Sequence, residues 1–587
     1  MDDEEIRIQG APVSEGIAIG ISFFLSLSQE ENIPEFPIAM AEIDQEIARY
    51  RQALFSSRTD LERLQNDLVN EGSMDAITII DTHIQMLNDP LMTTLMEEKI
   101  RQMKQNTESV FRSVINEYEK RFSQTKDSFF QQRLIDVKDV SKRILGHLCY
   151  KPKLSFSDIP PNSVIFTKEL VPSDTAAVQA SRVKAFVTQK GVRNSHAALI
   201  ARAKGIPYVA SVDVHLFQNL KGKSVIVDGI TGDVIVNPSA ITLEKYREQK
   251  TKLRTHYKLL EKETHFKAET FDGYPIQVYA NIGSLSDLGH LHQQGATGIG
   301  LFRTEFLFLE KSTFFHSEEE QHSAYHRIVE AAKDLPIIIR VFDVGGDKIP
   351  DSFLGQPKEP NPVLGCRGIR FLLRNKKIFR TQLRAILRVT PYGDVKILLP
   401  MISDINELRE TRQIINSVTQ ELIEEGLNVK KNVLLGCMIE VPSAALICDA
   451  IAQESDFLSI GTNDLVQYTL GVDRDNAEMS DFYLPTHPSV IRLIKMIAII
   501  ARRHNRPINV CGEMASNPLF IPLLIGLGIN ELSCTPRFIP VIKRIIRQCS
   551  LIDAYKIADQ ILTLNTASQI SKVLLETHQQ LSPEFPG

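Results

Sequence analysis

Apolar residues recur at regular steps through the first quarter of the chain. Between about residues 40 and 148 they follow one another at intervals of three, four and seven, in a stripe that begins with Ile43, Ile47, Tyr50 and Leu54. This period places them on one face of a helix, so the segment is predicted to form an amphipathic helical bundle. Further helices are expected over residues 75–88, 90–122 and 126–148, with a break at Asn88-Asp89-Pro90.

Short β-like runs flank this helical segment on both sides. One group lies in the first 30 residues, and a second alternates with helical pieces between about 152 and 240. Because both groups contain the same kind of short β-like run, we expect them to form one α/β domain made of residues 1–32 and 148–240. An all-helical domain is then inserted at 33–147. A highly charged run over 241–268 is typical of a solvated, stiff linker helix.

Eight short apolar runs, separated by helical stretches, follow between residues 269 and 587. Eight strands alternating with helices over about 300 residues are typical of a (β/α)8 barrel. A flat, doubly wound sheet is the competing fold, but it does not need all eight strands. The expected strands are 276–282, 298–305, 336–343, 395–402, 433–440, 456–464, 508–513 and 529–534.

Polar and charged residues stand at the carboxyl ends of these expected strands, where the working groups of such barrels lie. Buried charges are costly unless they are paired or bind a ligand. The set therefore indicates an anion-binding cavity, although structural ion pairs around the barrel rim would use the same residue types. Its members are Asn281, Arg303, Arg340, Asp343, Glu440, Asn463, Asp464, Cys511 and Glu513, with Arg367 and Arg474 in following loops.

The residue types in this set narrow the class of ligand. Guanidinium groups form two-point contacts with phosphate and carboxylate oxygens. Two acids from adjacent strands, Glu440 and Asp464, suit Mg²⁺, which keeps waters and takes oxygens from a phosphorylated substrate. A small phosphate ester or enol phosphate fits both features. Cys511 at a strand end is placed to donate or accept a proton, although a lone cysteine is more often buried and structural.

One histidine follows two helix-capping residues in the run GVRNSHAALIARAKGIP, residues 191–207. Asn194 and Ser195 are N-cap types, and Gly205 is a typical stop after the helical run. His196 is therefore expected in the first turn of a helix, where free N–H groups favour a negative charge. A neutral imidazole there is well placed to carry a phosphoryl group. A surface or core histidine beside a helix cap is the plainer interpretation.

Composition narrows the function classes further. The 587 residues are 43% hydrophobic and 24% charged, with a formal net charge of -5 and no basic block, so nucleic-acid binding is not expected. The acidic N-terminus is not expected to be a signal peptide, and no apolar stretch long enough to predict a membrane span occurs. Seven scattered cysteines without a CxxC pair favour a reducing cytoplasm over disulfides or a zinc site.

Taken together, the motifs resemble a known family, Enzyme I of the bacterial phosphotransferase system, a phosphoenolpyruvate–protein phosphotransferase. The likeness extends from about residue 8 to about residue 575, in the same domain order. Two runs, ELVPSDTAA and SHAALIARAKGIP, match the family's phosphohistidine domain. Four further runs match the family's barrel domain, namely GIGLFRTEFLFLEK (298–311), RVFDVGGDK (340–348), SIGTNDLVQYTLGVDR (459–474) and VCGEMA (510–515).

This resemblance implies a mechanism with named site residues. His196 takes the phosphoryl group of phosphoenolpyruvate in the presence of Mg²⁺ and passes it to a histidine of the small phosphocarrier protein HPr. The family's magnesium ligands fall on Glu440 and Asp464, and its proton donor to the enolate carbon falls on Cys511. HPr is implied to dock on residues 33–147, and the barrel to carry a homodimer contact. The family's phosphoenolpyruvate contacts fall on Arg303, Arg340, Asn463, Asp464 and Arg474, with Arg367 and Lys348 as further phosphate contacts.

The loop before the histidine departs from the family pattern Gly-Gly-Arg-Thr-Ser-His. Val192 and Asn194 replace the second glycine and the threonine. Valine is restricted to negative φ and adds bulk beside an incoming phosphate, so a lower turnover or a differently shaped loop is expected. A regulatory, HPr-binding pseudo-enzyme therefore stays open as an alternative. A pyruvate-phosphate dikinase or phosphoenolpyruvate synthase relative would need an ATP-binding domain, and the chain has no glycine-rich phosphate loop for one.

Overall fold

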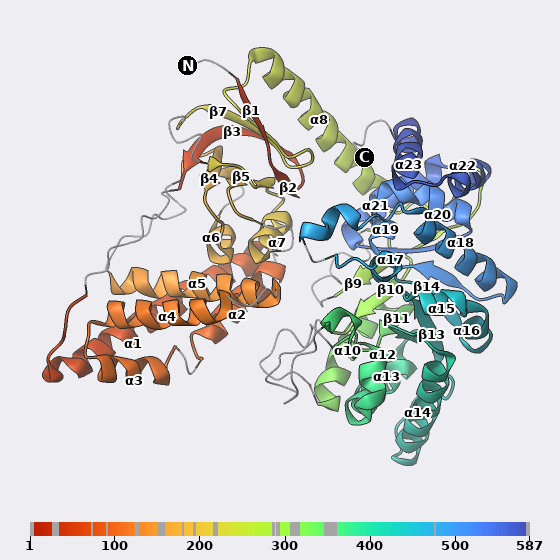
Figure 1. Cartoon of the computed structure of the whole chain (residues 1–587), viewed down its shortest axis with the longest axis horizontal. Helices are drawn as coiled ribbons and strands as arrows, with labels where there is room; N and C mark the ends of the chain where they lie inside the picture. The colour runs from red at the N-terminus through yellow and green to blue at the C-terminus, as the bar shows by residue number, and fades with distance from the viewer. Residues whose placement is uncertain are drawn as a thin grey trace. The chain divides into compact units, whose positions relative to one another are not determined.

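The computed structural model divides the chain into two compact units, Met1–Arg254 and Thr255–Gly587, which are described separately below (Figure 1). The four-part division expected from the sequence stays a prediction. The structure describes residues 5–25, 35–71, 74–89, 92–123, 128–149, 159–178, 181–191, 195–214, 221–283, 288, 291, 294–305, 317–345, 361–474 and 477–582.

An eight-stranded sheet forms the α/β part of the first unit, in the order β1-β8-β7-β3-β4-β5-β6-β2. Strand β3 pairs in parallel with β4 and antiparallel with β7. Strands from before and after the helical segment therefore share one sheet, as the β-like runs on both sides of that segment predict. The strands are β1 (Ile6–Gln9), β2 (Ala11–Ser14), β3 (Ile17–Phe24), β4 (Ser163–Thr167), β5 (Val183–Thr188), β6 (Tyr208–Ala210), β7 (Ser224–Asp228) and β8 (Asp233–Val236).

The expected helical bundle interrupts that sheet between β3 and β4 (Figure 1). Its apolar stripe is buried, with Tyr50, Leu61 and Leu68 of the first helix fully enclosed. Because the stripe faces the neighbouring helices, burial of its side chains holds the bundle together. The helices are α1 (Ile43–Glu71), α2 (Met74–Met86), α3 (Thr94–Met103), α4 (Thr107–Ser123) and α5 (Ser128–Leu148).

The single helix expected over 90–122 is wrong, because the chain breaks between α3 and α4. Lys104 takes the left-handed conformation, with φ of 50°, and ends α3. The break pairs with residues far earlier in the sequence: Gln105 bridges Pro37, and the Asn106 side-chain oxygen accepts from the Phe36 N–H at 3.2 Å. Helical periodicity cannot reveal a break that a distant strand-like segment holds in place.

Two short helices of the α/β part, α6 (Pro172–Ala177) and α7 (His196–Ala203), pack against the bundle. Ala176 and Ile200 belong to the same buried cluster as the bundle's core. Asp139 of α5 accepts hydrogen bonds from the Ser173 N–H at 2.7 Å and the Ser173 hydroxyl at 2.6 Å. These contacts fix α6 and α7 on the bundle.

The charged linker forms the helix α8 (Ala240–Glu263), which ends five residues before the expected 268. The boundary between the two compact units, at Arg254 and Thr255, falls inside this helix. Its polar composition matches a solvated helix, as the sequence predicts.

The second unit is a closed barrel of eight parallel strands in the order β10-β11-β12-β13-β14-β15-β16-β9 (Figure 1). All eight expected strands are present, and each ends before its predicted last residue or at it. This confirms the (β/α)8 barrel and leaves the candidate residues at the strand ends or just beyond them. The strands are β9 (Gln277–Ile282), β10 (Ile299–Arg303), β11 (Ile337–Arg340), β12 (Val395–Leu399), β13 (Leu434–Ile439), β14 (Phe457–Ile460), β15 (Ile508–Val510) and β16 (Glu531–Cys534).

Side chains fill the barrel interior, and the large apolar core lies between the strands and the surrounding helices. Gly436 of β13 shows how tight the interior is, because a Cβ there would lie 2.4 Å from the ring of Phe457. The helices are α10 (Glu318–Ala332), α12 (Ile369–Arg374), α13 (Lys376–Val389), α14 (Ile405–Glu424), α15 (Pro442–Leu446), α16 (Cys448–Glu454), α17 (Thr462–Leu470), α18 (Pro488–Arg503), α19 (Glu513–Ser516), α20 (Ile521–Leu527), α21 (Ile539–Gln548), α22 (Leu551–Thr563) and α23 (Ala567–Leu581).

None of the helices in the described parts of the chain is long and apolar enough to cross a bilayer.

Candidate active site

Two arginines end adjacent strands at the mouth of the barrel. Arg303 of β10 and Arg340 of β11 are register partners. Arg340 is buried and ion-paired to Glu305 and, at 3.3 Å, to Asp343. Burial alone would lower the pKa of Arg340, but these two carboxylates outweigh it and raise the pKa above its usual value.

Arg303 has a different environment. It is half-buried, and no hydrogen bond or ion pair of its guanidinium is found among the described residues. Burial, followed by the positive charge of Arg340, lowers the pKa of Arg303. The charge of Glu305 opposes this decrease without cancelling it. A half-buried cation with no ion pair among the described residues is expected to favour binding of an anionic ligand.

Arg367 joins two acids that follow different strands, Asp343 after β11 and Asp464 after β14. Its Nε and Nη2 donate to the two carboxylate oxygens of Asp343 at 2.9 and 2.8 Å. Its Nη1 donates to Asp464 Oδ1 at 3.0 Å. The loop that carries Arg367 bridges Gly345, where a Cβ would lie 2.1 Å from the Cys366 carbonyl oxygen and φ is +131°. Only glycine allows the two backbones to approach so closely.

Two carboxylates form the acidic side of the site. Glu440 follows β13 and is 1% exposed, and Asp464 lies in the first turn of α17 and is 7% exposed. The Met401 N–H donates to Glu440 Oε1 at 2.6 Å. Burial first, then the charges of Asp464 and Asp343, raise the pKa of Glu440 to about 8. A buried carboxyl group with a raised pKa and two acidic neighbours is a position where a cation would be favourable.

The donor set fits Mg²⁺ better than a softer metal. Glu440 and Asp464 offer oxygen ligands, as Mg²⁺ requires, and two protein ligands leave room for waters and substrate oxygens. Among the described residues no group of three or more His, Cys, Asp or Glu side chains is arranged as a metal site.

Asn463 and Arg474 lie on the open side of the site. Asn463 is half-buried, accepts from the Glu513 N–H at 2.8 Å and donates to the Glu513 carboxylate at 3.3 Å. Arg474 is exposed, and its backbone N–H donates to Gln467 Oε1 at 3.1 Å. The charge of Arg474 contributes to the lowered pKa of Arg303, which places the two guanidinium groups in electrostatic reach of each other.

Cys511 follows β15 and is 2% exposed, among apolar side chains inside the barrel. Burial raises the pKa of its thiol to about 11, and a contact with the Ser459 hydroxyl at 3.2 Å opposes the rise. The thiol is therefore neutral at physiological pH. Asn281, from the expected strand-end set, donates to the backbone oxygen of Cys511 at 2.9 Å.

His196 lies in the first unit, apart from the barrel in the sequence. It is the first residue of α7, and the Ser195 hydroxyl accepts from the Ala198 N–H at 3.2 Å as the N-cap. Gly205, with φ of +63°, follows the helix end. The expected helix start and stop are thus confirmed. The side chain of His196, residues 192–194 and Lys348 lie outside what the structure describes.

Sequence reasoning missed three groups that complete the site. Glu305 balances Arg340, the Met401 N–H holds Glu440, and Ser459 touches the Cys511 sulfur. Glu305 lies within the quoted GIGLFRTE run and Ser459 begins another quoted run, so their positions were visible in the sequence. Their partners were not visible, because these depend on strands that are distant along the chain.

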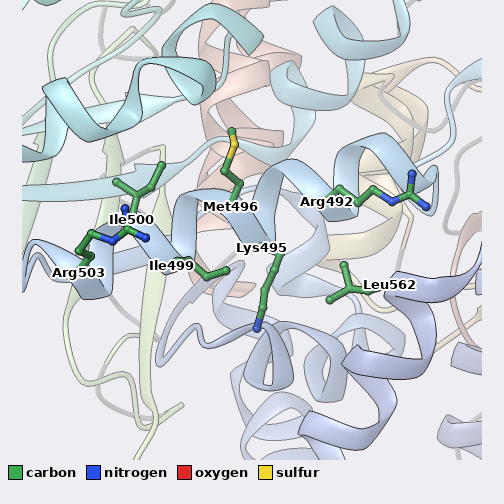
Figure 2. A pocket seen from close by; sticks show the side chains of 7 residues that line it. All are labelled: Arg492, Lys495, Met496, Ile499, Ile500, Arg503 and Leu562. Carbon is green, nitrogen blue, oxygen red and sulfur yellow. The ribbon is translucent and has the colours of Figure 1, made fainter.

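A separate groove of about 420 Å³ lies on the outer side of α18, in the same unit (Figure 2). Its lining joins apolar and cationic side chains and includes none of the strand-end residues. The lining consists of Arg492, Lys495, Met496, Ile499, Ile500, Arg503 and Leu562.

Comparison with known proteins matches the barrel and the rest of the chain to one group of enzymes. The model for the PEP-binding domain of PEP-utilising enzymes matches residues 257–551. The models for the N-terminal and mobile domains of the same enzymes match residues 9–133 and 159–232. A phosphoenolpyruvate-protein phosphotransferase of Priestia megaterium is 36% identical over 575 residues, which cover 97% of this chain and 99% of the relative.

The chain belongs to the phosphoenolpyruvate-protein phosphotransferase family.

Other members of the family also match this chain over nearly its whole length. The Listeria innocua protein is 35% identical over 97% of this chain and 98% of its own length, and the Bacillus subtilis protein is 34% identical over 97% and 99%. The solution structure of an Enzyme I protein aligns with 42% of this chain and 99% of its own, at 29% identity and a TM-score of 0.36, too low to add to the argument.

Proposed function

We propose that the chain transfers the phosphoryl group of phosphoenolpyruvate to its own His196 and then to a histidine of the phosphocarrier protein HPr. Besides family membership, one structural observation supports this proposal. Charged groups from separate strands and loops converge at one barrel mouth, in an arrangement suited to a small, doubly anionic ligand. The converging residues are Arg303, Arg340, Asp343, Arg367, Glu440 and Asp464.

The arginines are proposed to contribute to substrate binding in different ways. Arg340 and Arg367 are held rigidly by buried acids, so they keep a fixed geometry around the phosphate. Arg303, which has a lowered pKa and no ion pair among the described residues, is expected to receive the largest electrostatic benefit from an anion. Asn463, Arg474 and Lys348 are proposed as further contacts to phosphoenolpyruvate.

Glu440 and Asp464 are proposed to hold Mg²⁺ together with substrate oxygens. When bound, the ion supplies positive charge that neutralises the phosphate and the developing enolate. The arginines add to this electrostatic stabilisation at positions that need no rearrangement during the reaction.

The group transfer is proposed to proceed in two balanced steps. His196 Nε2 forms a bond to phosphorus while the bond from phosphorus to the enol oxygen breaks, which leaves phosphohistidine and the enolate of pyruvate. The Cys511 S–H then gives its proton to the enolate carbon, and the resulting thiolate regains a proton from water. Protonation makes the sequence strongly favourable, because the enolate cannot return to the phosphate ester.

His196 and the barrel residues belong to different compact units, so the proposal requires movement between two positions. We propose that α8, which contains the unit boundary, is the connection over which the first unit moves. A crosslink that locks the units in one arrangement is expected to leave one half-reaction intact and abolish the other. A locked protein that completes both would contradict this part of the proposal.

Three further parts of the proposal follow the family. HPr docks on the helical bundle α1–α5, and two copies associate through the barrel. The protein works in the bacterial cytoplasm, which is consistent with seven cysteines that form no disulfide.

Labelled phosphoenolpyruvate tests the proposal directly. Incubation with Mg²⁺ is expected to give an acid-labile, base-stable label on the wild type and none on His196→Ala, and addition of HPr is expected to remove the label from the wild type. A wild type that takes no label would favour the regulatory pseudo-enzyme. A label that persists in His196→Ala would overturn the assignment of the phosphorylated residue.

A further inference from the structure

The Cys511 sulfur has an immediate polar neighbour that no step above uses. Ser459 lies on β14 and Asn509 on β15, and the two residues are register partners in the parallel ladder. Ser459, Asn509 and Cys511 are 0%, 1% and 2% exposed. Ser459 Oγ lies 3.2 Å from Cys511 Sγ and 2.5 Å from Asn509 Oδ1. The three side chains thus form a buried row, with Ser459 in the middle.

With the Asn509 amide oriented as in the structure, the two hydrogens on Ser459 Oγ and Cys511 Sγ cannot serve all three contacts of the row at once. The Ser459 hydroxyl has a single hydrogen and two neighbours that would accept it. Asn509 Nδ2 is buried and has no hydrogen-bond partner among the described residues, which is rare for a buried amide. Cys511 Sγ has another contact, as a donor to the Ile460 carbonyl oxygen at 3.6 Å. Rotation of the Asn509 amide therefore gives the row a second hydrogen-bond arrangement.

In the first arrangement the sulfur is a neutral thiol. Its hydrogen points to the Ile460 oxygen, and the Ser459 hydroxyl donates to Asn509 Oδ1. In the second arrangement the Asn509 amide is rotated by half a turn, so that Nδ2 donates to Ser459 Oγ and the Ser459 hydroxyl donates to the sulfur. The oxygen and nitrogen of an amide have nearly the same shape, so the rotation needs no extra space. The second arrangement stabilises a thiolate, because a charged acceptor strengthens its hydrogen bonds.

We propose that Ser459 and Asn509 are positioning residues for proton transfer at Cys511, switching from the first arrangement to the second as the thiol gives its proton to the enolate carbon. This inference rests on the proposed role of Cys511. The step is balanced: the S–H bond breaks, a C–H bond forms, the negative charge moves from the enolate to the sulfur, and water later restores the thiol.

The need for such a switch follows from the burial of the sulfur. A thiolate in an apolar interior is unfavourable, and burial is the largest cause of the raised thiol pKa. Cys511 belongs to a buried apolar cluster with Leu301, Ile338, Leu398, Met438 and Phe457. Arg303 and Arg340 favour the thiolate by their charge, and Glu440 opposes it. Ser459 is the hydroxyl group that contacts the sulfur directly.

The reverse proton transfer gives a readout that does not need phosphoryl transfer. In deuterium oxide with Mg²⁺, the enzyme is expected to exchange the methyl hydrogens of pyruvate, because the thiolate removes a proton and the enolate takes deuterium back. Nuclear magnetic resonance of pyruvate follows the exchange. Its rate is expected to rise with pH as the thiolate forms.

Ser459→Ala is expected to slow this exchange at least tenfold at pH 8 and to shift its pH profile to higher pH, while the KM for phosphoenolpyruvate changes less than twofold. Asn509→Leu, similar in volume but without hydrogen bonds, is expected to do the same. Ser459→Thr, which keeps the hydroxyl, is expected to restore the pH profile. Ser455→Ala is the matched control, because Ser455 is also fully buried but precedes the opposite end of β14.

The outcomes separate this inference from the proposed function. If Cys511→Ala abolishes exchange while Ser459→Ala and Asn509→Leu keep the wild-type rate and pH profile, the inference is wrong and the role of Cys511 stands. If Cys511→Ala exchanges as fast as the wild type, the proposed proton donor is wrong. If Ser455→Ala slows exchange as much as Ser459→Ala, the effect is one of packing and the inference is overturned.

Discussion

Arg303 and Arg340 are register partners on adjacent strands, yet only Arg340 is ion-paired to acids within the described residues. The two guanidinium groups are therefore expected to have different roles. Arg340 belongs to a charge-balanced network of the folded barrel, whereas Arg303 has no ion pair within the described residues, and the charge of Glu305 offsets only part of the decrease in its pKa. This contrast gives a way to separate binding from stability.

Arg303→Gln is expected to raise the KM for phosphoenolpyruvate about 10- to 100-fold, the range of a lost charge-assisted contact, with no loss of thermal stability. Arg340→Gln is expected to weaken binding as well, but also to lower the free energy of unfolding by about 3–5 kcal/mol, because it leaves the buried Glu305 carboxylate without its ion pair. Steady-state kinetics and denaturant unfolding measure the two effects. Equal losses of stability in both variants would contradict the assignment.

Asp343→Asn tests the acid that holds two arginines in place. Asp343 is fully buried and contacts both Arg340 and Arg367, so its neutral isostere is expected to raise the KM for phosphoenolpyruvate and to destabilise the barrel by about 3 kcal/mol or more. Asp559→Asn, at an exposed position of α22, is the control and is expected to change neither. A normal KM in Asp343→Asn would show that the arginines keep their places without this acid.

Glu440→Gln is expected to change how barrel stability depends on pH. The folded-state pKa of Glu440, about 8, lies above the ordinary value, so between about pH 4.5 and 8 the unfolded chain loses a proton that the folded protein keeps. The wild type therefore loses stability as pH rises through this range, and the glutamine variant does not. Near pH 4.5 the two should unfold alike, and near pH 8 the variant should be more stable, by on the order of a few kcal/mol. Denaturant unfolding in metal-free buffer at several pH values measures the difference.

Mg²⁺ alone is expected to raise the Tm of the wild-type barrel, since a ligand that binds only the folded state stabilises it. Glu440→Gln should remove this stabilisation, because one of the two carboxylates is lost. Differential scanning calorimetry with and without a chelator measures both proteins. A Tm shift that survives in the variant would place the ion elsewhere.

Ser195→Ala removes the side chain that caps α7 at His196. The lost hydrogen bond to the Ala198 N–H is expected to lower the stability of the first unit by about 1 kcal/mol. Phosphorylation from phosphoenolpyruvate should slow, because the helix N-terminus that is proposed to receive the phosphoryl group frays. Ser195→Asp, which keeps a capping oxygen, is expected to restore stability, as measured by thermal unfolding. A variant Ser195→Ala as stable as the wild type would mean that another group caps the helix.

Periodicity and motif content in the sequence determined the broad architecture. Strands 276–282 and 433–440 were predicted because buried strands are short and apolar, and that signal is local. The same local logic placed His196 at a helix start, and it placed Arg303, Arg340 and Glu440 at strand ends. The eight-strand count then implied one mouth for all of them.

The tertiary structure determined which side chains contact one another. Nothing local says that Arg367 bridges Asp343 and Asp464, that Glu305 pairs with Arg340, or that Ser459 contacts Cys511. Nor does periodicity reveal the break at Lys104, which depends on pairing with residues some 70 positions earlier. Secondary structure follows from neighbours along the chain, whereas charge balance and hydrogen bonding depend on which distant segments the closed barrel brings together.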